Sequence, residues 1–219
     1  MSLPRSFLNM PGSESKTADF HLPEVFELDL RLPTNEEVQG YARDLSLQRF
    51  YMREVYCEKY SYALLTKDFI EDLAMIIGAE TAIEVGAGAG WLSYWLRQHG
   101  ANMVSTTDDM SWKKKEKRIY APGVEQEDAV SAVLDNRTSF VLLCWPYMDD
   151  MAERVWKALT PGQKLIYIGE TNGGCCANDN FFQMVGNMDW DNRVKSLVQW
   201  DGIHDICCVE PCGLESPLY

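Results

Sequence analysis

Short apolar runs alternate with amphipathic segments through the middle of the chain. Residues 82–85, 139–144 and 164–168 are the clearest runs, and two weaker ones end near residues 107 and 126. Apolar runs of this length are typical of strands buried on both faces of a parallel sheet. The segments between them carry apolar residues at helical spacing. This alternation predicts an α/β fold with a doubly wound, mostly parallel sheet and right-handed crossovers.

The residues ahead of the first strand favour helices. Thr34 and Glu37 have the spacing of a capping box, and the helix that they begin is expected to run toward Tyr56 with a break near Ser46. Residues 66–78 predict a second helix, because a threonine cap comes first and a glycine comes last. The N-terminal part of the chain is therefore expected to be a helical extension of the sheet.

The C-terminal part predicts an antiparallel hairpin. Residues 194–200 and 203–209 are two runs with strand character, and Asp201 and Gly202 form a turn signal between them. With five strands before it, this hairpin gives a seven-stranded, Rossmann-like sheet.

The length and composition agree with a single domain. A chain of 219 residues can bury a substantial core. We expect an arm over residues 1–24 and one domain over residues 25–219, with a helical lid at 25–78 and a sheet core at 79–212. Residues 28–32 alternate in polarity and predict an edge strand or an extended lead-in to the first helix.

The candidate chemistry lies in the glycine-rich stretch that follows the first strand. Gly86, Gly88 and Gly90 alternate with alanine, and a helix begins at Trp91. Strand, glycine turn and helix together make a unit that cradles a nucleotide, because glycine lets the backbone turn tightly and approach a ligand. The dinucleotide fingerprint G-x-G-x-x-G places a glycine where Trp91 stands, so the spacing disfavours a nicotinamide oxidoreductase.

The order E-x-G-x-G-x-G, from Glu84 to Gly90, resembles the first motif of class I S-adenosylmethionine-dependent methyltransferases. The resemblance covers roughly residues 60–210. Several further pieces resemble an uncharacterised group of methyltransferase-like proteins from microbes and fungi, namely residues 60–63, 84–88, 142–146, 167–170, 173–175 and 200–205. The resemblance implies S-adenosylmethionine as cofactor and methyl transfer as the reaction.

The resemblance also assigns cofactor-binding residues to the ends of the first three strands. The backbone of the glycine turn would face the methionine part of the cofactor, and Glu84 would help to position its amino group. Asp108, or Asp109 if the strand is shifted by one residue, would bind the ribose hydroxyls. Asp128 and Ala129, after the third strand, would lie near the adenine. The residues that the resemblance assigns to the cofactor at these three strand ends are Glu84, Gly86, Ala87, Gly88, Gly90, Asp108, Asp128 and Ala129.

The end of the fourth strand is expected to face the methyl group. The sequence Cys144-Trp145-Pro146-Tyr147 is similar to the [D/N/S]-P-P-[Y/F/W] motif of amino-group methyltransferases, but Trp145 replaces the polar residue and Tyr147 the second proline. Amine methylation is therefore not supported by this motif. Trp145 and Tyr147 could form an aromatic wall beside the sulfonium, and packing of both rings in the core is the alternative.

We expect Tyr62, Trp145 and Glu170 to line one cleft beside the glycine turn, with Tyr62, Cys144 and Trp145 against the cofactor. The alternative is that the tyrosines only pack the N-terminal helices onto the sheet. No catalytic base can be assigned. The candidates for a catalytic role are Trp145, Tyr147 and Glu170. His204 and Asp205 are further candidates, at loop or hairpin positions that are expected to face the substrate.

The net charge and the cysteine content limit the classes of partner and the cellular compartment that the sequence is compatible with. The net charge of −13 argues against duplex nucleic acid and favours a neutral or cationic small molecule or side chain as substrate. No apolar run reaches the about 20 residues of a membrane span, and no secretory signal is recognisable. Seven cysteines without C-x-x-C spacing suggest reduced thiols, a cytoplasmic protein and no metal site.

The sequence thus predicts an enzyme that transfers a methyl group from S-adenosylmethionine to a small or side-chain nucleophile. A non-catalytic module that retains the cofactor fold for binding or interaction is the alternative, because the amine-type motif is altered at Trp145 and Tyr147. The methyl acceptor and the oligomeric state stay open.

Overall fold

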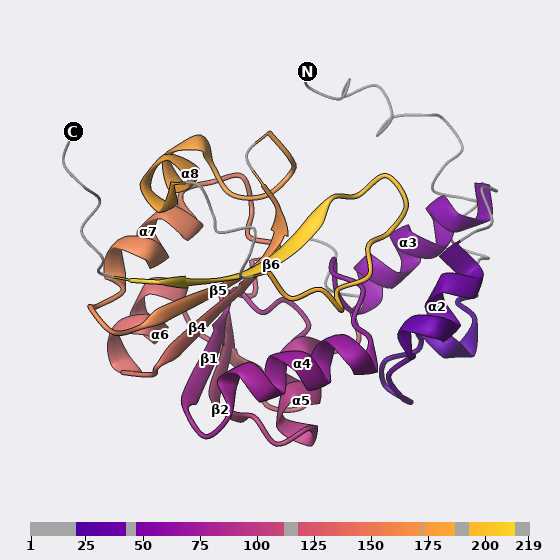
Figure 1. Cartoon of the computed structure of the whole chain (residues 1–219), viewed down its shortest axis with the longest axis horizontal. Helices are drawn as coiled ribbons and strands as arrows, with labels where there is room; N and C mark the ends of the chain where they lie inside the picture. The colour runs from indigo at the N-terminus through magenta and orange to yellow at the C-terminus, as the bar shows by residue number, and fades with distance from the viewer. Residues whose placement is uncertain (1–20, 43–46, 112–117, 172, 187–192, 213–219) are drawn as a thin grey trace.

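One sheet organises the chain (Figure 1). The computed structural model describes residues 21–42, 47–111, 118–171, 173–186 and 193–212. Within these residues the sheet has six strands in the order β3-β2-β1-β4-β5-β6, and β6 is the one antiparallel strand. The strands are β1 (Thr81–Val85), β2 (Asn102–Asp108), β3 (Glu125–Gln126), β4 (Phe140–Cys144), β5 (Lys164–Glu170) and β6 (Asp205–Pro211).

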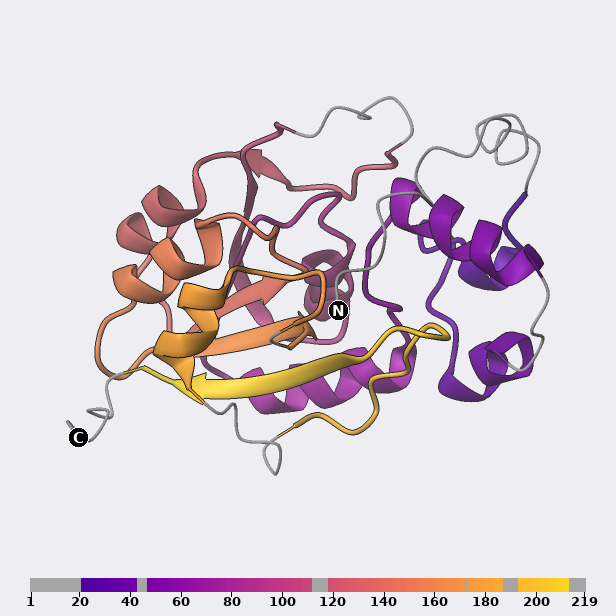
Figure 2. The ribbon, with the colours of Figure 1, turned by 90° about the horizontal axis from the view of Figure 1, so that it is seen from above.

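Alternate residues of the central strands supply two separate cores. In β1, Ala82 faces the core shared with α4 (Lys67–Ile77) and α5 (Trp91–Gln98), whereas Ile83 faces the opposite core. The second core is covered by three helices, α6 (Ala129–Asp135), α7 (Met151–Ala158) and α8 (Asp179–Val185). Figure 2 shows these two helical layers on either side of the sheet. The buried strands thus explain the apolar runs in the sequence, and the α/β prediction is confirmed.

The N-terminal helices pack beside the sheet rather than on one of its faces (Figure 2). They are η2 (Glu24–Phe26), α2 (Asn35–Ala42) and α3 (Leu47–Lys59). The predicted capping box is present, because the Thr34 amide donates to Glu37 Oε2 at 2.8 Å and the Glu37 amide donates to Thr34 Oγ1 at 3.2 Å. The predicted break near Ser46 falls between α2 and α3, and residues 43–46 lie outside the described residues.

The predicted antiparallel C-terminal strand is present as β6, but the described residues form six strands rather than seven, because its predicted partner at residues 194–200 is not a strand. Residues 194–200 form turns and irregular chain, and a backbone hydrogen bond of 2.8 Å from Val194 N to Cys207 O connects the start of this segment to β6. The segment leaves the edge of β6 because Trp200 is buried against the N-terminal helices, where its ring stacks on Phe26 at 5.7 Å. Packing of one large side chain thus replaces a strand ladder.

The expected strand or extended lead-in at residues 28–32 is also corrected. Residues 28–30 form a turn, in which Leu28 is buried and Leu30 is 58% exposed. In the described part of the chain, no helix is long and apolar enough to cross a membrane.

Candidate active site

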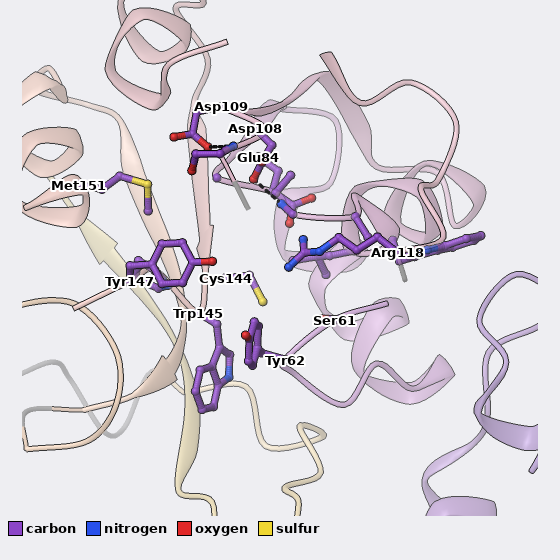
Figure 3. Close-up of a pocket in the computed structure, with 18 of the residues that line it drawn as sticks. Ser61, Tyr62, Glu84, Asp108, Asp109, Arg118, Cys144, Trp145, Tyr147 and Met151 are labelled. Carbon is purple, nitrogen blue, oxygen red and sulfur yellow. Dashed lines mark hydrogen bonds between the residues drawn. The ribbon is translucent and has the colours of Figure 1, made fainter. Parts of the chain in front are cut away.

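The carboxyl ends of β1, β2 and β4 meet at one edge of the sheet. The strand order reverses between β1 and β4, and open α/β sheets bind ligands in the crevice at such a point. A pocket opens there between the sheet edge and the segment that connects α3 to α4 (Figure 3). Its floor is the glycine turn after β1, and the remaining walls come from the ends of β2 and β4 and the start of α7.

The glycine turn is left-handed at three positions. Gly86, Gly88 and Gly90 have φ of 61°, 58° and 78°, values that residues other than glycine rarely adopt. A Cβ on Gly86 would lie 3.2 Å from the Met151 side chain, and one on Gly88 would lie 2.6 Å from Arg118 Nη1. The turn therefore brings bare backbone to the pocket surface.

Asp108 ends β2 and holds the glycine turn in place. Its Oδ2 accepts a hydrogen bond of 2.8 Å from the Gly88 amide, and its Oδ1 accepts one of 2.8 Å from the Met110 amide. Asp109 also lines the pocket and accepts a bond from the Ser111 amide. Two adjacent carboxylates thus lie at the strand end where the sequence predicted one.

Glu84 lies beneath the turn and is 1% exposed. Its Oε2 accepts hydrogen bonds from Ser93 N at 3.0 Å and from Ser93 Oγ at 2.5 Å, so it ties β1 to the first turn of α5. Burial raises the pKa of Glu84 to about 7, against the lowering effect of the Ser93 bonds. Glu84 also belongs to the lining of the pocket, at its buried base.

Aromatic side chains form the wall opposite Asp108. The rings of Tyr62 and Trp145 are stacked, with centroids 5.4 Å apart and planes at 19°. Figure 3 shows the hydroxyl group of Tyr147 directed into the pocket from the other side of Cys144. Burial raises the pKa of Tyr62, Tyr147 and Cys144, so these groups stay neutral near pH 7.

Most of the residues predicted from the sequence line this one pocket. They are Tyr62, Glu84, Gly86, Ala87, Gly88, Asp108, Asp128, Cys144, Trp145 and Tyr147, together with Asp109 as the alternative to Asp108. Of the three residues expected to line one cleft beside the glycine turn, Tyr62 and Trp145 do so and Glu170 does not.

Five predicted residues lie outside the pocket lining: Gly90, Ala129 and Glu170, and the further candidates His204 and Asp205. A Cβ on Gly90 would instead clash with Val124 Cγ2, so this glycine permits close packing of the turn against the segment before β3. Ala129 is buried among the helices of the second core. Glu170 is 8% exposed and accepts a 2.9 Å bond from the Cys175 amide, which closes the loop after β5.

Arg118 is the main lining residue that the sequence analysis missed. It belongs to the basic run at residues 112–118, of which residues 112–117 lie outside the described residues. In Figure 3 its guanidinium group reaches into the pocket, and the Cβ contact given above places it beside Gly88. Two backbone bonds fix the segment that follows, from Ile119 N to Lys59 O at 3.0 Å and from Ala121 N to Ala89 O at 2.8 Å. Nothing local in the sequence signals this long-range connection.

Trp91, which the spacing argument treated as an obstacle, has a structural role. It is 5% exposed, its ring packs edge-on against Tyr60 at 5.8 Å, and its Nε1 donates to Ile119 O at 2.6 Å. Within the described residues, no three His, Cys, Asp or Glu side chains are placed to hold a metal ion.

The chain is similar in fold to several solved structures. Human N-acetylserotonin methyltransferase, solved with S-adenosylmethionine, has a TM-score of 0.43 at 12% identity, covering 92% of this chain and 66% of that one. NodS, an N-methyltransferase from Bradyrhizobium japonicum, has a TM-score of 0.41 at 13% identity, covering 65% of this chain and 92% of that one. The glycopeptide N-methyltransferase MtfA, also solved with S-adenosylmethionine, has a TM-score of 0.32 at 15% identity, covering 48% of this chain.

The chain spans 54% of the length of MtfA. No protein-family model and no curated protein matches the sequence.

Proposed function

We propose that the protein binds S-adenosylmethionine in this pocket and transfers its methyl group to a small or side-chain nucleophile. The observation that carries the proposal is the left-handed glycine turn between β1 and α5, with Asp108 bonded to Gly88 at the point where the strand order reverses. A ligand with a polar amino-acid end and a ribose matches both parts of this site.

The residues present fit that cofactor. Bare backbone at Gly86 and Gly88 leaves room for the methionine part, and a side chain at either position would intrude on Met151 or Arg118. The Arg118 guanidinium would pair with the carboxylate of the methionine part, and Glu84 would accept from its amino group. Asp108 and Asp109 would hold the ribose, and Asp128, which caps α6, would lie near the adenine.

When bound, S-adenosylmethionine supplies a methyl group on a sulfonium centre, which is open to in-line displacement. The residues of this chain contribute mainly position. Tyr62, Trp145 and Tyr147 exclude water from one side of the pocket and offer aromatic faces and edges to a cation. The Tyr147 hydroxyl is the polar group best placed to meet an acceptor, because it points into the pocket (Figure 3).

The charges of the pocket favour a neutral or cationic acceptor. Five aspartates line it, at positions 108, 109, 128, 149 and 150, together with the arginines at positions 118 and 154. Arg154 is paired with Asp128 at 3.5 Å, so its charge is offset within the wall. An excess of carboxylates repels phosphate-rich polymers and attracts cations.

Isothermal titration with S-adenosylhomocysteine tests the proposal. We expect the wild-type chain to bind it with a dissociation constant of about 1–100 μM, the range in which many cofactor sites work. Gly86→Arg should abolish the heat of binding, because the new side chain would fill the pocket beside Met151.

Gly100→Arg is the matched control. Gly100 also has a positive φ, of 90°, but a Cβ there meets no other atom within 4 Å. This variant also places an arginine at a positive φ and adds the same charge, but away from the pocket, so it should bind S-adenosylhomocysteine like the wild type. Failure of the folded wild-type protein to bind, or equal loss in both variants, would contradict the proposed function. Binding of NAD instead would favour an oxidoreductase.

A non-catalytic role is the second candidate. It is motivated by Trp145 and Tyr147, which replace the polar residue and the proline of the amine-type motif. Binding of S-adenosylmethionine without methyl transfer to any member of a library of amines, phenols, thiols and peptides would favour it over catalysis.

A further inference from the structure

Trp145 is held in an unusual conformation at the end of β4. Its φ is 53°, a left-handed value that is costly for a residue with a bulky side chain. Its backbone amide donates to Ile168 O at 2.7 Å, which anchors it to β5. Strain of this kind persists only where surrounding contacts fix the residue, so the contacts of the indole ring are informative.

Three neighbours fix the indole ring. Tyr62 stacks on it, and the guanidinium carbon of Arg53 in α3 lies 5.6 Å from its centroid. The indole Nε1 donates a hydrogen bond of 3.1 Å to Asp205 Oδ2. The indole of Trp145 thus lines the pocket on one side and is hydrogen-bonded to the Asp205 carboxyl group behind it.

Asp205 begins β6 and is paired with Glu170 across the β5–β6 ladder. It is 2% exposed and does not line the pocket. Its second oxygen, Oδ1, is buried and has no hydrogen-bond partner among the described residues. A buried carboxyl group that is half satisfied costs stability, which suggests a role beyond packing.

We infer that Asp205 is a positioning residue, which fixes the indole of Trp145 as a wall of the pocket and holds it more firmly in the charged than in the neutral state. The bond to a carboxylate is charge-assisted and therefore stronger than the bond to a neutral carboxyl group. The inference deepens the proposed function, because this wall would contact the cofactor and the acceptor, and to that extent it rests on that function.

The groups around Asp205 place the change between its neutral and its charged state near neutral pH. Burial raises the pKa of Asp205 to about 7, the Trp145 bond lowers it, Glu170 of β5 raises it and Arg53 of α3 lowers it. The thiol and phenol groups that also sense the charge of Asp205 belong to Cys57, Cys144, Tyr167 and Cys176, and burial keeps all four neutral. Asp205 therefore gains its charge, and its stronger hold on Trp145, as the pH rises through about 7.

Fluorescence of Trp145 tests the inference without any ligand. The signal is the difference in emission between the wild type and Trp145→Phe, followed from about pH 5.5 to about pH 8.5, a range that spans the raised pKa. We expect a transition with a midpoint near 7. Asp205→Asn should abolish the transition, because the amide does not titrate although its oxygen can still accept the indole bond. Glu170→Gln should keep the transition and lower its midpoint, because Glu170 raises the pKa of Asp205.

A flat signal in the wild type, or an unchanged transition in Asp205→Asn, would overturn the inference. The second readout is S-adenosylhomocysteine binding at about pH 8, where Asp205 is charged. Asp205→Asn should retain affinity within about threefold, whereas Asp205→Leu, which removes the acceptor, should lose about tenfold or more. Equal affinities for the two variants would also overturn it. A normal fluorescence transition in a wild-type protein that binds no S-adenosylhomocysteine would contradict the proposed function and leave the positioning role supported.

Discussion

At the scale of single residues, buried carboxyl groups stand out. Glu84 and Asp205 are 1% and 2% exposed, and burial raises the pKa of each to about 7. Each makes hydrogen bonds that favour the charged form, and in both cases desolvation outweighs them. Groups that change charge near neutral pH, at or beside a pocket, are typical of functional sites.

The raised pKa of Glu84 has a consequence for stability. A carboxyl group whose pKa is higher in the folded state adds stability below its unfolded pKa, and this contribution is lost as the pH rises through the folded pKa. Between about pH 4.5 and pH 7 the free energy of unfolding should fall by on the order of 3 kcal/mol because of Glu84, since each pH unit between its unfolded and folded pKa contributes about 1.36 kcal/mol. Glu84→Gln should remove this part of the slope in urea denaturation measured across that pH range.

The control is Glu71→Gln on the exposed face of α4, which should leave the slope as it is in the wild type. Glutamine can still accept from Ser93, so Glu84→Gln is expected to fold. A slope that is equal in wild type and Glu84→Gln would show that Glu84 does not change its protonation on unfolding in this range.

At the scale of elements, α5 connects the glycine turn to two other parts of the chain. Trp91 Nε1 donates to Ile119 O at 2.6 Å, next to Arg118 in the pocket. One turn later, Trp95 Nε1 donates to Leu28 O at 3.1 Å in the N-terminal extension. Helix α5 thus binds the chain next to Arg118 through the indole of Trp91, and it binds the N-terminal extension through the indole of Trp95.

These two tryptophans make a matched pair of variants. Trp91→Phe and Trp95→Phe should each lower the free energy of unfolding by about 1–3 kcal/mol, because each leaves a carbonyl group without its donor. Only Trp91→Phe is expected to weaken S-adenosylhomocysteine binding, since Trp91 lines the pocket and fixes the residue next to Arg118. Urea denaturation and calorimetric titration measure the two effects. Equal losses of affinity in both variants would contradict this division of roles.

At the scale of the whole molecule, the N-terminal helices and the sheet share one core. Phe26 from η2 packs against Tyr56 of α3 at 6.3 Å and stacks on Trp200 at 5.7 Å, and all three belong to the cluster that includes β1 and β4. The single domain expected over residues 25–219 stays a prediction, with this shared core as its physical basis.

A shared core should unfold in one cooperative transition. Phe26→Ala should lower the free energy of unfolding by about 3–5 kcal/mol and shift the far-ultraviolet circular dichroism and tryptophan fluorescence curves together. The check is coincidence of the two curves in urea, for the wild type and for the variant. Two separate transitions, with only the first sensitive to Phe26→Ala, would instead indicate that the extension unfolds as its own unit.

The local sequence determined the type of the main elements. The apolar runs at β4 and β5 have the pattern of strands that are covered on both faces, and both faces are covered in the structure. The glycines of the turn adopt positive φ, the Thr34–Glu37 capping box forms as its spacing indicates, and the lining of the pocket follows from the strand ends. Most of the cofactor residues that the resemblance implied line the pocket, and Gly90 and Ala129 do not.

Only the tertiary structure decided the features that depend on contacts between distant residues. Residues 194–200 have strand character, yet burial of Trp200 against Phe26 draws them away from the sheet. Arg118 enters the pocket because its segment is bonded to Lys59 and Ala89, and Glu170 turns to the loop after β5 rather than to the pocket. Hydrophobic period and turn chemistry are local, whereas these positions follow from side-chain packing and long-range hydrogen bonds, which one stretch of sequence does not contain.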